Sequence, residues 1–430
     1  MRAAAEPQPG GAMRRLGRRQ DPIAGMDPAG AERSRQEGAT CADFFARLLQ
    51  ARAKRCRHVL GLISGTSMDG IDVARVAING SGRDLKLRVL STVTKPYPAS
   101  LAERLRHAHR AGVAEIAELD VLVGHAFAAA ALEHLADQGV DPTDLDLAGS
   151  HGQTVYHQPP SSGQVGTTLQ LGDGDLIAQR LGVPTVSDFR RRDMAAGGEG
   201  APLVPYLDAL LFGEGEGPRA LLNLGGIANV TYLPGSSAKA VGFDTGPGNM
   251  VLDALASWAT EGRQLRDEDG RLALCGRVDE RLLGRLLSHP FFFQALPRST
   301  GREQFGEAFV EWVLREGEGR SPEDLLATAT ALSARAVAAT LRGARALVPE
   351  PPGVVIASGG GVHNPALMAA LRTALEPTAV RTTAEYGIPV DGKEAVLFAV
   401  LANETLCGRA GNLPAVTGAS APVPLGKVSL

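Results

Sequence analysis

Runs of apolar residues separated by short polar turns predict several strands in the first half of the chain. Residues 59–76 hold two apolar, β-leaning stretches on either side of a turn of small and polar residues. They predict a pair of strands, and the alternation over 84–93 predicts a third antiparallel strand. The elements that follow are, in order, two helical stretches over 99–138, a buried strand at 145–150, a helix from about Asp173 and a strand at 184–187.

The same order recurs in the second half. Residues 219–232 again read as strand, glycine-centred turn and strand, and residues 240–243 supply a third strand before a helix from about Asn249. The remaining elements are, in order, helices at about 307–315 and 321–348, a strand at 353–357, a helix from Pro365 and a last helix at about 392–407. Strands mixed with helices in this way favour α/β layers. We therefore expect an α/β protein of two halves that share a topology.

The composition suits a globular protein of two or more domains. The chain has 430 residues, of which 44% are hydrophobic and 21% charged, and this is enough apolar material for a large core. The net charge of −3 gives no sign of a nucleic-acid or membrane partner, so small-molecule chemistry is favoured. Four scattered cysteines without a Cys-x-x-Cys pair argue against a disulfide framework or zinc site and fit a cytoplasmic location. No stretch of about 18 apolar residues predicts a membrane span.

Residues 1–57 differ from the rest because they are rich in alanine, glycine, proline and arginine. We predict disorder up to about Gly38 and then a short amphipathic helix with Thr40 as its cap. Acidic residues in this extension argue against a transit peptide. A start at Met13 or Met26 is an alternative account of the extension.

The turn at 65–70 is a candidate phosphate-binding loop. Its glycines tolerate the backbone conformations that wrap an anion, and its N–H groups and hydroxyls can point inward. The carboxylates of Asp69 and Asp72 could hold a magnesium ion, directly or through water. An ordinary hairpin turn, which the same residue types favour, is the alternative.

Two later glycine-rich turns also follow strands. Asn223-Leu-Gly-Gly-Ile-Ala-Asn229 lacks bulky side chains, and together with the first turn it could grip a polyphosphate from the opposite side. The triple glycine at 359–361 stands between a strand and a helix, where a flat group can lie against bare backbone. Taken alone, it could equally be a plain strand-to-helix turn.

Polar residues after two predicted strands are candidates for binding a polyol. His151, with Gln153 and Thr154, follows the strand at 145–150, and open α/β sheets place ligand groups at such strand ends. A histidine that caps a buried strand is the alternative. The run at 188–193 mixes fixed charges just before a glycine-rich stretch, which favours a tight site wall over the usual solvated surface.

Two carboxylates are candidates for acid–base chemistry. Asp244 sits at a predicted strand edge before a helix, and its ordinary pKa near 3.9 would leave it ionised at pH 7, as a general base requires. It could instead serve as a turn or helix-capping residue. Glu394 lies in the first turn of the last predicted helix, where the helix dipole alone would stabilise a carboxylate.

A set of short motifs follows one another along the chain. They lie at 61–72, 149–154, 188–205, 223–230, 242–249, 299–306, 387–389 and 416–419. Taken together, these segments resemble the anhydro-N-acetylmuramic acid kinase family. The resemblance runs in order from about Val59 to the C-terminal end and leaves only the N-terminal extension uncovered. Glu199 departs from the pattern, because glutamine is expected there.

The resemblance implies two ribonuclease-H-like domains of the actin-like ATPase fold, with ATP and substrate in an interdomain cleft. We expect domain I at 58–205 plus 392–430 and domain II at 206–391, after the extension at 1–57. The implied cofactors are ATP and Mg²⁺, with Asp69 as the magnesium residue. The implied ATP-binding residues are Gly65, Thr66, Ser67, Met68, Asp69, Gly70, Ile71, Asp72, Asn223, Gly225, Gly226, Asn229, Gly359, Gly360 and Gly361. The implied substrate-binding residues are His151, Gln153, Thr154, Asp188, Arg190 and Arg191.

The family converts 1,6-anhydro-N-acetylmuramic acid, ATP and water into N-acetylmuramic acid 6-phosphate and ADP during peptidoglycan recycling. By resemblance, Asp244 is the base that activates the water and Glu394 is a second acidic residue near the sugar. The partner is then a small amino sugar, and a homodimer is one option for the assembly. Another sugar or polyol kinase of the same fold, or an actin-like or chaperone-like nucleotide switch, are the alternatives.

Overall fold

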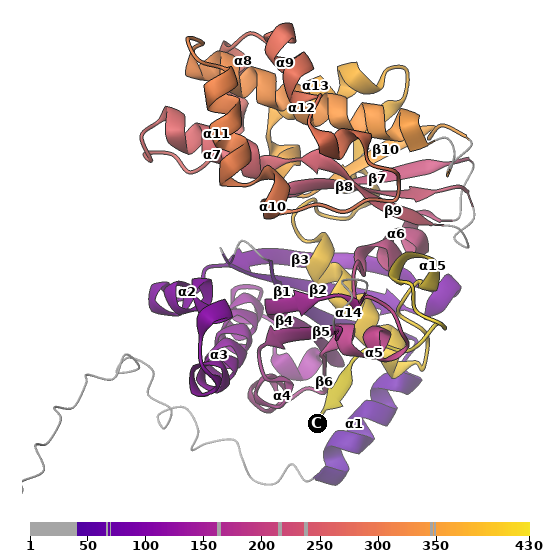
Figure 1. The fold of residues 1–430 in the computed structure, drawn as a ribbon. Coiled ribbons are helices and arrows are strands. Elements are labelled where there is room, and N and C mark those ends of the chain that lie inside the picture. The colour runs from indigo at the N-terminus through magenta and orange to yellow at the C-terminus, as the bar shows by residue number, and fades with distance from the viewer. Residues whose placement is uncertain are drawn as a thin grey trace, which may run out of the picture. The chain divides into compact units, whose positions relative to one another are not determined.

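The computed structural model of the protein (Figure 1) describes residues 41–65, 68, 70–160, 165–213, 217–235, 240–344, 347 and 350–430. The predictions made for residues 1–40, for Thr66 and Ser67 and for Asp69 lie outside this range. The chain divides into two compact units, Met1–Asp43 and Phe44–Leu430. Apart from the first residues of helix α1 (Cys41–Ala53), every element below belongs to the second unit.

The first sheet has seven strands in the order β12-β6-β4-β1-β2-β3, with β5 paired to β4 (Figure 1). Strand β2 pairs antiparallel with both β1 and β3, whereas β4 pairs parallel with both β1 and β6. Its strands are β1 (Cys56–Ser64), β2 (Ile71–Asn79), β3 (Lys86–Lys95), β4 (Leu147–Gln158), β5 (Thr167–Leu171), β6 (Thr185–Ser187) and β12 (Lys427–Ser429).

The second sheet has five strands in the order β11-β10-β7-β8-β9. Strands β7, β8 and β9 are antiparallel, whereas β7, β10 and β11 run parallel, so the pairing of the first sheet is repeated. The repeat of topology predicted from the sequence is confirmed, and the fold is α/β with two ribonuclease-H-like sheets. Its strands are β7 (Arg219–Leu224), β8 (Ile227–Leu233), β9 (Val241–Pro247), β10 (Val354–Ser358) and β11 (Ala379–Thr382).

Helices cover both faces of the first sheet. Side chains alternate between the faces of a strand, so Leu60 and Leu62 of β1 join the core formed with α2, α3 and α4, whereas Val59 and Ile63 join the core formed with α6 and α14. The helices of this part are α2 (Ala99–Arg106), α3 (Val113–Asp137), α4 (Gly174–Leu181), α5 (Phe189–Ala195), α6 (Val204–Phe212), α14 (Lys393–Leu406) and α15 (Pro414–Thr417).

Helix α14 lies unusually close to the sheet because two strands present glycines to it. A Cβ atom on Gly61 of β1 would lie 1.8 Å from the carbonyl oxygen of Ala395, and one on Gly149 of β4 would lie 2.1 Å from that of Phe398. No side chain fits in such a gap. These glycines therefore determine how deeply α14 packs.

One face of the second sheet carries the larger helical layer. Buried side chains of β7, β8 and β9 pack there against α7, α9, α11, α12 and α13. On the opposite face, Ala209 and Phe212 of α6 pack against Leu221 of β7 and Ile356 of β10. The helices are α7 (Asn249–Ala259), α8 (Arg271–Cys275), α9 (Glu280–Leu286), α10 (Arg302–Phe305), α11 (Glu307–Glu316), α12 (Pro322–Gly343) and α13 (Pro365–Leu375).

Strand β4 differs from its prediction. It continues to Gln158, so His151 and Gln153 lie inside the strand and not after its end. Its register against β1 shifts between Leu62 and Ser64, and the second half of β4 pairs instead with β5, which the sequence pattern did not predict. This polar stretch becomes a strand because β5 supplies backbone partners.

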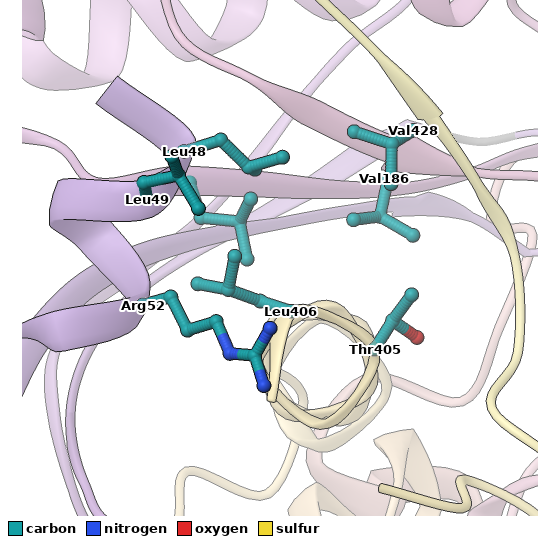
Figure 2. Close-up of a pocket in the computed structure, with 8 residues that line it drawn as sticks. Leu48, Leu49, Arg52, Val186, Thr405, Leu406 and Val428 are labelled. Atoms are coloured by element: carbon teal, nitrogen blue, oxygen red, sulfur yellow. The ribbon is translucent and has the colours of Figure 1, made fainter. Parts of the chain in front are cut away.

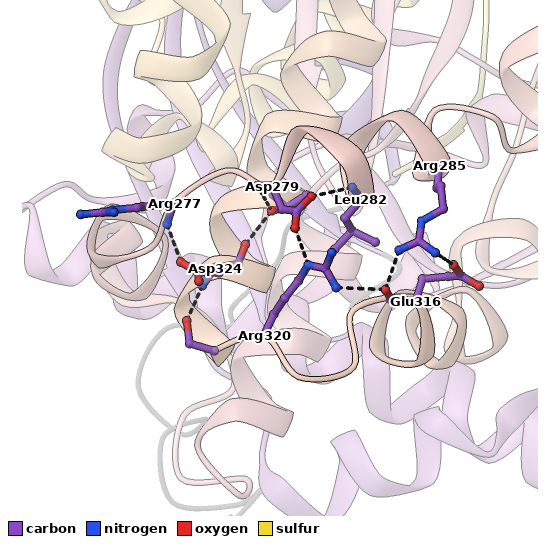
Figure 3. Close-up of polar contacts among 9 residues, drawn as sticks. Arg277, Asp279, Leu282, Arg285, Glu316, Arg320 and Asp324 are labelled. Carbon is purple, nitrogen blue, oxygen red and sulfur yellow. Dashed lines mark hydrogen bonds and ion pairs between the residues drawn. The ribbon is translucent and has the colours of Figure 1, made fainter.

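A polar network secures the start of α9 (Figure 3). Asp279 accepts a hydrogen bond from the Leu282 N–H at 2.8 Å and another from Arg320 Nε at 2.7 Å. Arg285 pairs with Glu316 at 2.6 Å. None of the residues labelled in Figure 3 is a candidate site residue. Across the helices that the structure describes, none has the length and apolar character needed to cross a membrane.

Candidate active site

A row of polar side chains crosses the second sheet. Ser358 of β10 pairs with Asn223 of β7, Asn223 pairs with Asn229 of β8, and Asn229 pairs with Asp244 of β9. Their neighbours along the strands, Leu222, Leu224, Val230 and Phe243, belong to the large apolar core. Because side chains alternate, the polar row lies on the opposite face, which α6 only partly covers.

Two of the predicted glycine-rich loops meet at one end of this row. Gly359 has φ of +87°, and a Cβ atom on it would lie 2.8 Å from Oδ1 of Asn223. A Cβ atom on Gly361 would lie 2.7 Å from Cβ of Leu224. The two loops pack backbone against backbone, and this close approach is what requires glycine there.

Helix α7 holds the Gly225–Gly226 turn in place. The N–H of Asn249 donates to the Gly225 carbonyl at 2.8 Å, and the N–H of Gly248 donates to that of Gly226 at 3.0 Å. Asn249 Nδ2 also donates to the Leu224 carbonyl at 3.2 Å. A Cβ atom added to Gly225 would meet nothing closer than 3.5 Å, so there is room beside its backbone. Bare, accessible backbone of this kind fits the phosphates of a nucleotide.

Asp244 lies within β9 and is held by the segment just before α10. Its Oδ2 accepts a hydrogen bond from the Thr300 N–H at 2.7 Å, and its own N–H donates to the Arg298 carbonyl at 2.9 Å. The N-cap residue of α7 is Gly248, which has no side chain to cap the helix. The alternative in which Asp244 caps that helix is therefore wrong.

The environment of Asp244 changes its pKa from the ordinary value used in the sequence analysis. Burial raises the pKa of Asp244 to about 6, and the charge of Glu303 adds to the rise. The Thr300 hydrogen bond and the charge of Arg298 oppose the rise. The expectation of an ordinary pKa near 3.9 is thus wrong. A carboxyl with a pKa of about 6 is still mainly ionised at pH 7, and it is a stronger base than an exposed aspartate.

Arg298 was missed in the sequence and holds this segment together. Its Nη1 donates to the carbonyls of Phe291 and Phe292 at 3.0 Å, and its Nη2 donates to Thr340 Oγ1 at 2.9 Å. The guanidinium group also lies 4.3 Å from the centroid of the Phe291 ring. Its position directly before the 299–306 motif was the available signal.

A hydroxyl beside Asp244 is available to a ligand. Within the described chain, the buried Oγ1 of Thr300 has no hydrogen-bond partner. A buried hydroxyl without a partner is costly. A substrate hydroxyl or water bound next to Asp244 would satisfy it.

A second cluster forms on the first sheet around His151. Arg190 of α5 donates from Nε to His151 Nε2 at 2.9 Å and from Nη1 to the Gly200 carbonyl at 2.8 Å. Burial holds the pKa of His151 well below its usual range, and the charge of Arg190 lowers it further. The ring is therefore neutral, with Nε2 as acceptor and the proton on Nδ1, which donates to the Gly152 carbonyl at 3.0 Å.

Glu394, at the start of α14, belongs electrostatically to the same cluster. Burial raises the pKa of Glu394, and the charges of Arg190 and Lys393 oppose the rise. One turn further along α14, the ring of Phe398 lies 4.5 Å from that of His151. The structure thus brings together His151, Arg190 and Glu394.

Asp193 was not predicted as a site residue, yet it organises this cluster. The carboxylate is fully buried, and its Oδ1 accepts hydrogen bonds from Asn412 and Thr417, both at 2.7 Å. Its Oδ2 accepts from the Gly200 N–H at 2.8 Å. Asp193 therefore ties the loop that Arg190 contacts to the C-terminal segment.

Other predicted substrate residues lie elsewhere. Gln153 donates to the Gly65 carbonyl at 3.2 Å and so links β4 to the first phosphate turn, while Thr154 accepts from Gln170 at 3.4 Å. Asp188 has φ of +56° and pairs with Lys427 at 2.6 Å and with the half-exposed Arg191 at 3.5 Å. Asp188 and Arg191 thus form a surface ion pair apart from the His151 contacts.

The first phosphate turn is described only in part. The Met68 N–H donates to the Gly65 carbonyl at 3.2 Å, and a Cβ atom on Gly70 would lie 2.6 Å from Cγ2 of Thr94. Ile71 is buried, and the carboxylate of Asp72 accepts from Thr94 Oγ1 at 2.6 Å. Within the residues described, no three of the acidic, histidine and cysteine side chains gather as a metal site would need.

A small cavity lies away from all of these residues (Figure 2). Its volume is about 130 Å³, and it opens beside α1, the end of α14 and strand β12. Its lining is mostly apolar and consists of Leu48, Leu49, Arg52, Leu147, Val186, Thr405, Leu406 and Val428. It contains none of the predicted site residues.

Two ribonuclease-H-like sheets with glycine-rich turns at their strand ends define the class, an α/β protein of the actin-like ATPase fold. A family model described as Anhydro-N-acetylmuramic acid kinase matches residues 57–430. The chain belongs to the anhydro-N-acetylmuramic acid kinase family.

Individual relatives agree with the family model. The anhydro-N-acetylmuramic acid kinase of Salinibacter ruber is 45% identical over 395 residues, which cover 89% of this chain and 98% of the relative. That of Gloeobacter violaceus is 46% identical over 374 residues, or 86% and 97% of the two chains. A solved activator of 2-hydroxyisocaproyl-CoA dehydratase from Clostridium difficile with bound ADPNP has a TM-score of 0.40 at 12% identity, covering 81% of this chain and 95% of that chain. That likeness is too distant to inform function.

Proposed function

We propose that this protein is an ATP-dependent kinase that converts 1,6-anhydro-N-acetylmuramic acid and water into N-acetylmuramic acid 6-phosphate in peptidoglycan recycling. Membership of the kinase family supports ATP as the phosphoryl donor and a small sugar as the acceptor. The observation that carries the proposal is Asp244, a half-buried carboxylate with a pKa of about 6, which lies on the same polar row as the glycine-rich loops but at its opposite end.

Asp244 has the properties that the hydrolytic half of the reaction needs. Neutral water is a poor nucleophile, and a largely ionised carboxylate can take its proton as the oxygen attacks the anomeric carbon. The bond from that carbon to the bridging 6-oxygen breaks as the new bond forms. The released 6-oxygen then attacks the γ-phosphorus of ATP, and the bond to ADP breaks. Thr300 would hold a reacting hydroxyl or water next to Asp244.

The nucleotide side of the proposal rests on backbone without side chains. We assign the phosphates to the turn at 65–72 and to Gly225 and Gly226, and the adenosine to the loop at 359–361. Oxygen ligands suit Mg²⁺, and Asp69, directly or through water, is the proposed residue to hold it. A bound magnesium ion would neutralise charge on the phosphates.

The sugar side of the proposal is the cluster of His151, Arg190 and Glu394. The remaining N–H groups of the Arg190 guanidinium can donate to sugar oxygens or to a carboxylate, while His151, whose two ring nitrogens are both engaged, holds Arg190 in place. Gln153 and Thr154, which lie near His151 on β4, remain proposed substrate-binding residues. Asp188 and Arg191 remain proposed substrate-binding residues at the edge of the sugar site. A homodimer and a cytoplasmic location also remain predictions.

Product analysis tests the function and separates the alternatives. The protein is incubated with 1,6-anhydro-N-acetylmuramic acid and Mg-ATP in water enriched in oxygen-18. We expect a product that has gained both a phosphoryl group and one labelled water oxygen at the anomeric position. A product that gains phosphate without water would identify an ordinary sugar kinase. ATP hydrolysis that ignores the sugar would identify a nucleotide switch.

A further inference from the structure

One buried ion pair joins elements that carry different parts of the candidate site. Nζ of Lys393, the first residue of α14, lies 2.6 Å from Oδ1 of Asp208 in α6. Both side chains are almost fully buried, at 6% and 2% exposure. Lys393 Nζ also lies 3.5 Å from Oγ of Ser358, the last residue of β10. A single ammonium group thus touches α6 and the strand that leads into the glycine loop at 359–361.

The helix dipole and burial both disfavour a lysine at position 393. The N-terminus of a helix carries a partial positive charge, which repels a cation in the first turn. Burial of an ammonium group is costly in addition, and a buried ion pair is often no more stable than an apolar pair of similar size. Two and three residues further along the helix, Ala395 and Val396 are fully buried in an apolar core. Stability alone therefore gives no reason for a lysine here.

Asp208 connects the ammonium group to the polar row. Burial raises the pKa of Asp208, and the charge of Lys393 and hydrogen bonds from Lys393 and Thr231 oppose the rise. Thr231 lies on β8, two residues from Asn229, which pairs with Asp244. The pair thus links the start of α14 to the strands that carry the candidate base.

Lys393 also stands directly beside Glu394, whose pKa its charge lowers. Just before α14, the Val390 carbonyl accepts a hydrogen bond from the Gly359 N–H at 2.9 Å. The candidate sugar-side acid and the candidate nucleotide loop are therefore attached to the same few residues. A shift at Lys393 would move both.

We propose that the Lys393–Asp208 pair is a positioning device, which holds Glu394 and the 358–361 loop in the relative placement that the coupled reaction needs. Lys393 and Asp208 are then positioning residues and do not touch the reacting atoms. This inference deepens the proposed function and rests on it for its assay. Misplacement of reacting groups by about 1 Å is enough to lower a rate by roughly a hundredfold.

The test is the double variant Lys393→Met with Asp208→Leu, which removes both charges and keeps apolar volume. We expect its Tm to stay within about 4 °C of the wild type, because an apolar pair replaces a buried ion pair at little cost. We expect kcat to fall at least about tenfold, with each KM changed by less than about threefold. If the ion pair served only to stabilise the fold, a double variant as stable as the wild type would also have the kcat of the wild type. A kcat within about twofold of the wild type would overturn the proposal.

Single variants sharpen this result. Lys393→Met alone leaves a buried, unpaired carboxylate, so it should lose both stability and kcat. Arg320→Met is the matched control, since it breaks the 2.7 Å pair with Asp279 in the network of Figure 3. Its kcat should equal that of the wild type. Loss of kcat in this control equal to the loss in the double variant would show that any broken ion pair suffices and would refute the proposal.

If the double variant does not fold, the variant Ser358→Ala tests the positioning role instead. It removes only the hydroxyl that lies near Lys393 and should leave Tm unchanged while kcat falls about threefold or more. An unchanged kcat would refute the positioning role.

The activity of the wild-type protein separates failure of the proposed kinase function from failure of the positioning role. If the wild type does not turn over the anhydro sugar, the proposed function is wrong. If the wild type turns it over and the double variant has the same kcat, only the positioning role is wrong.

Discussion

Asp244 illustrates how burial tunes a single carboxylate. One hydrogen bond from the Thr300 N–H supports its charge, but desolvation outweighs that support and raises its pKa to about 6. A carboxylate that is both ionised at neutral pH and relatively basic is suited to deprotonate water. The cost is borne by the fold, because a buried charge is destabilising.

The first prediction at this scale concerns Asp244→Asn. Loss of the base should lower kcat by roughly a hundredfold or more, because the 6-oxygen cannot accept phosphate until the anhydro bridge opens. Binding of both substrates should survive, since the glycine loops and the His151 cluster are untouched. Steady-state kinetics and calorimetric binding on the same folded variant check this. Near-normal turnover would remove Asp244 from the base role.

The second prediction concerns pH. The pKa of Asp244 is raised in the folded protein, so the active, ionised form is lost as the pH falls through about 6. The value of kcat should therefore drop about tenfold per pH unit below pH 6 if Asp244 is the base. The native state binds this proton more readily than the unfolded chain does, so the same group makes folding less stable as the pH rises through the window from about 4 to 6. A kcat profile that stays flat down to pH 5 would contradict the assignment.

At the scale of elements, α14 serves the site in several ways. It lies against Gly61 and Gly149 of the first sheet, presents Phe398 to the His151 ring, and begins with Lys393 and Glu394. Helix α14 can lie this close because Gly61 and Gly149 have no side chains. The position of Glu394 therefore depends on strands β1 and β4, which are far away in the sequence.

The prediction at this scale is that Gly61→Ala is destabilising. The new methyl group would lie 1.8 Å from the Ala395 carbonyl oxygen, so α14 must shift. Overpacking of this kind costs about 1–3 kcal/mol, and kcat should fall because Glu394 moves with the helix. Gly284→Ala in α9 is the control, because its added Cβ meets nothing within 4 Å. That variant should be neutral or more stable. If urea denaturation gave the two variants the same free energy of unfolding, close packing at Gly61 would not be the cause of any destabilisation.

At the scale of the molecule, the chain repeats one sheet topology and supports each copy with its own apolar core. The family match begins at residue 57, after α1. Helix α1 nevertheless contributes to the core that the first sheet forms with α6 and α14, because Ala51 is buried in that core and Leu48 packs against it. Any dispensable N-terminal segment should therefore end before α1.

This leads to a prediction for two truncations. Deletion of residues 1–40 should leave both stability and kcat unchanged, since the matched region and α1 remain. Deletion of residues 1–55 should cost about 1–3 kcal/mol of stability, because apolar contacts of α1 are lost, while kcat stays within about twofold at low temperature. Denaturation curves and activity of both proteins test this. Equal stability of the two truncated forms would show that α1 packing is negligible.

The sequence by itself determined most of the strands and the long helices in their order, the repeated topology and the family, but not strands β5, β11 and β12. Period-two alternation and glycine-rich turns are local signals, so the hairpins at 59–76 and 219–232 could be predicted. Local signals also singled out Asp244, which lies in the motif at 242–249, whereas Glu394 was singled out by its place in the first turn of the last predicted helix and by the family resemblance.

Only the tertiary structure decided how these residues are tuned and joined. The pKa of Asp244 follows from burial, and the neutral state of His151 follows from its burial and from Arg190, which lies 39 positions further along the chain. The hydrogen bonds of Asp193 to Asn412 and Thr417, and the pair of Lys393 with Asp208, likewise join segments that are far apart in sequence. Desolvation and long-range contacts depend on the packed core and leave no pattern in any one stretch of residues.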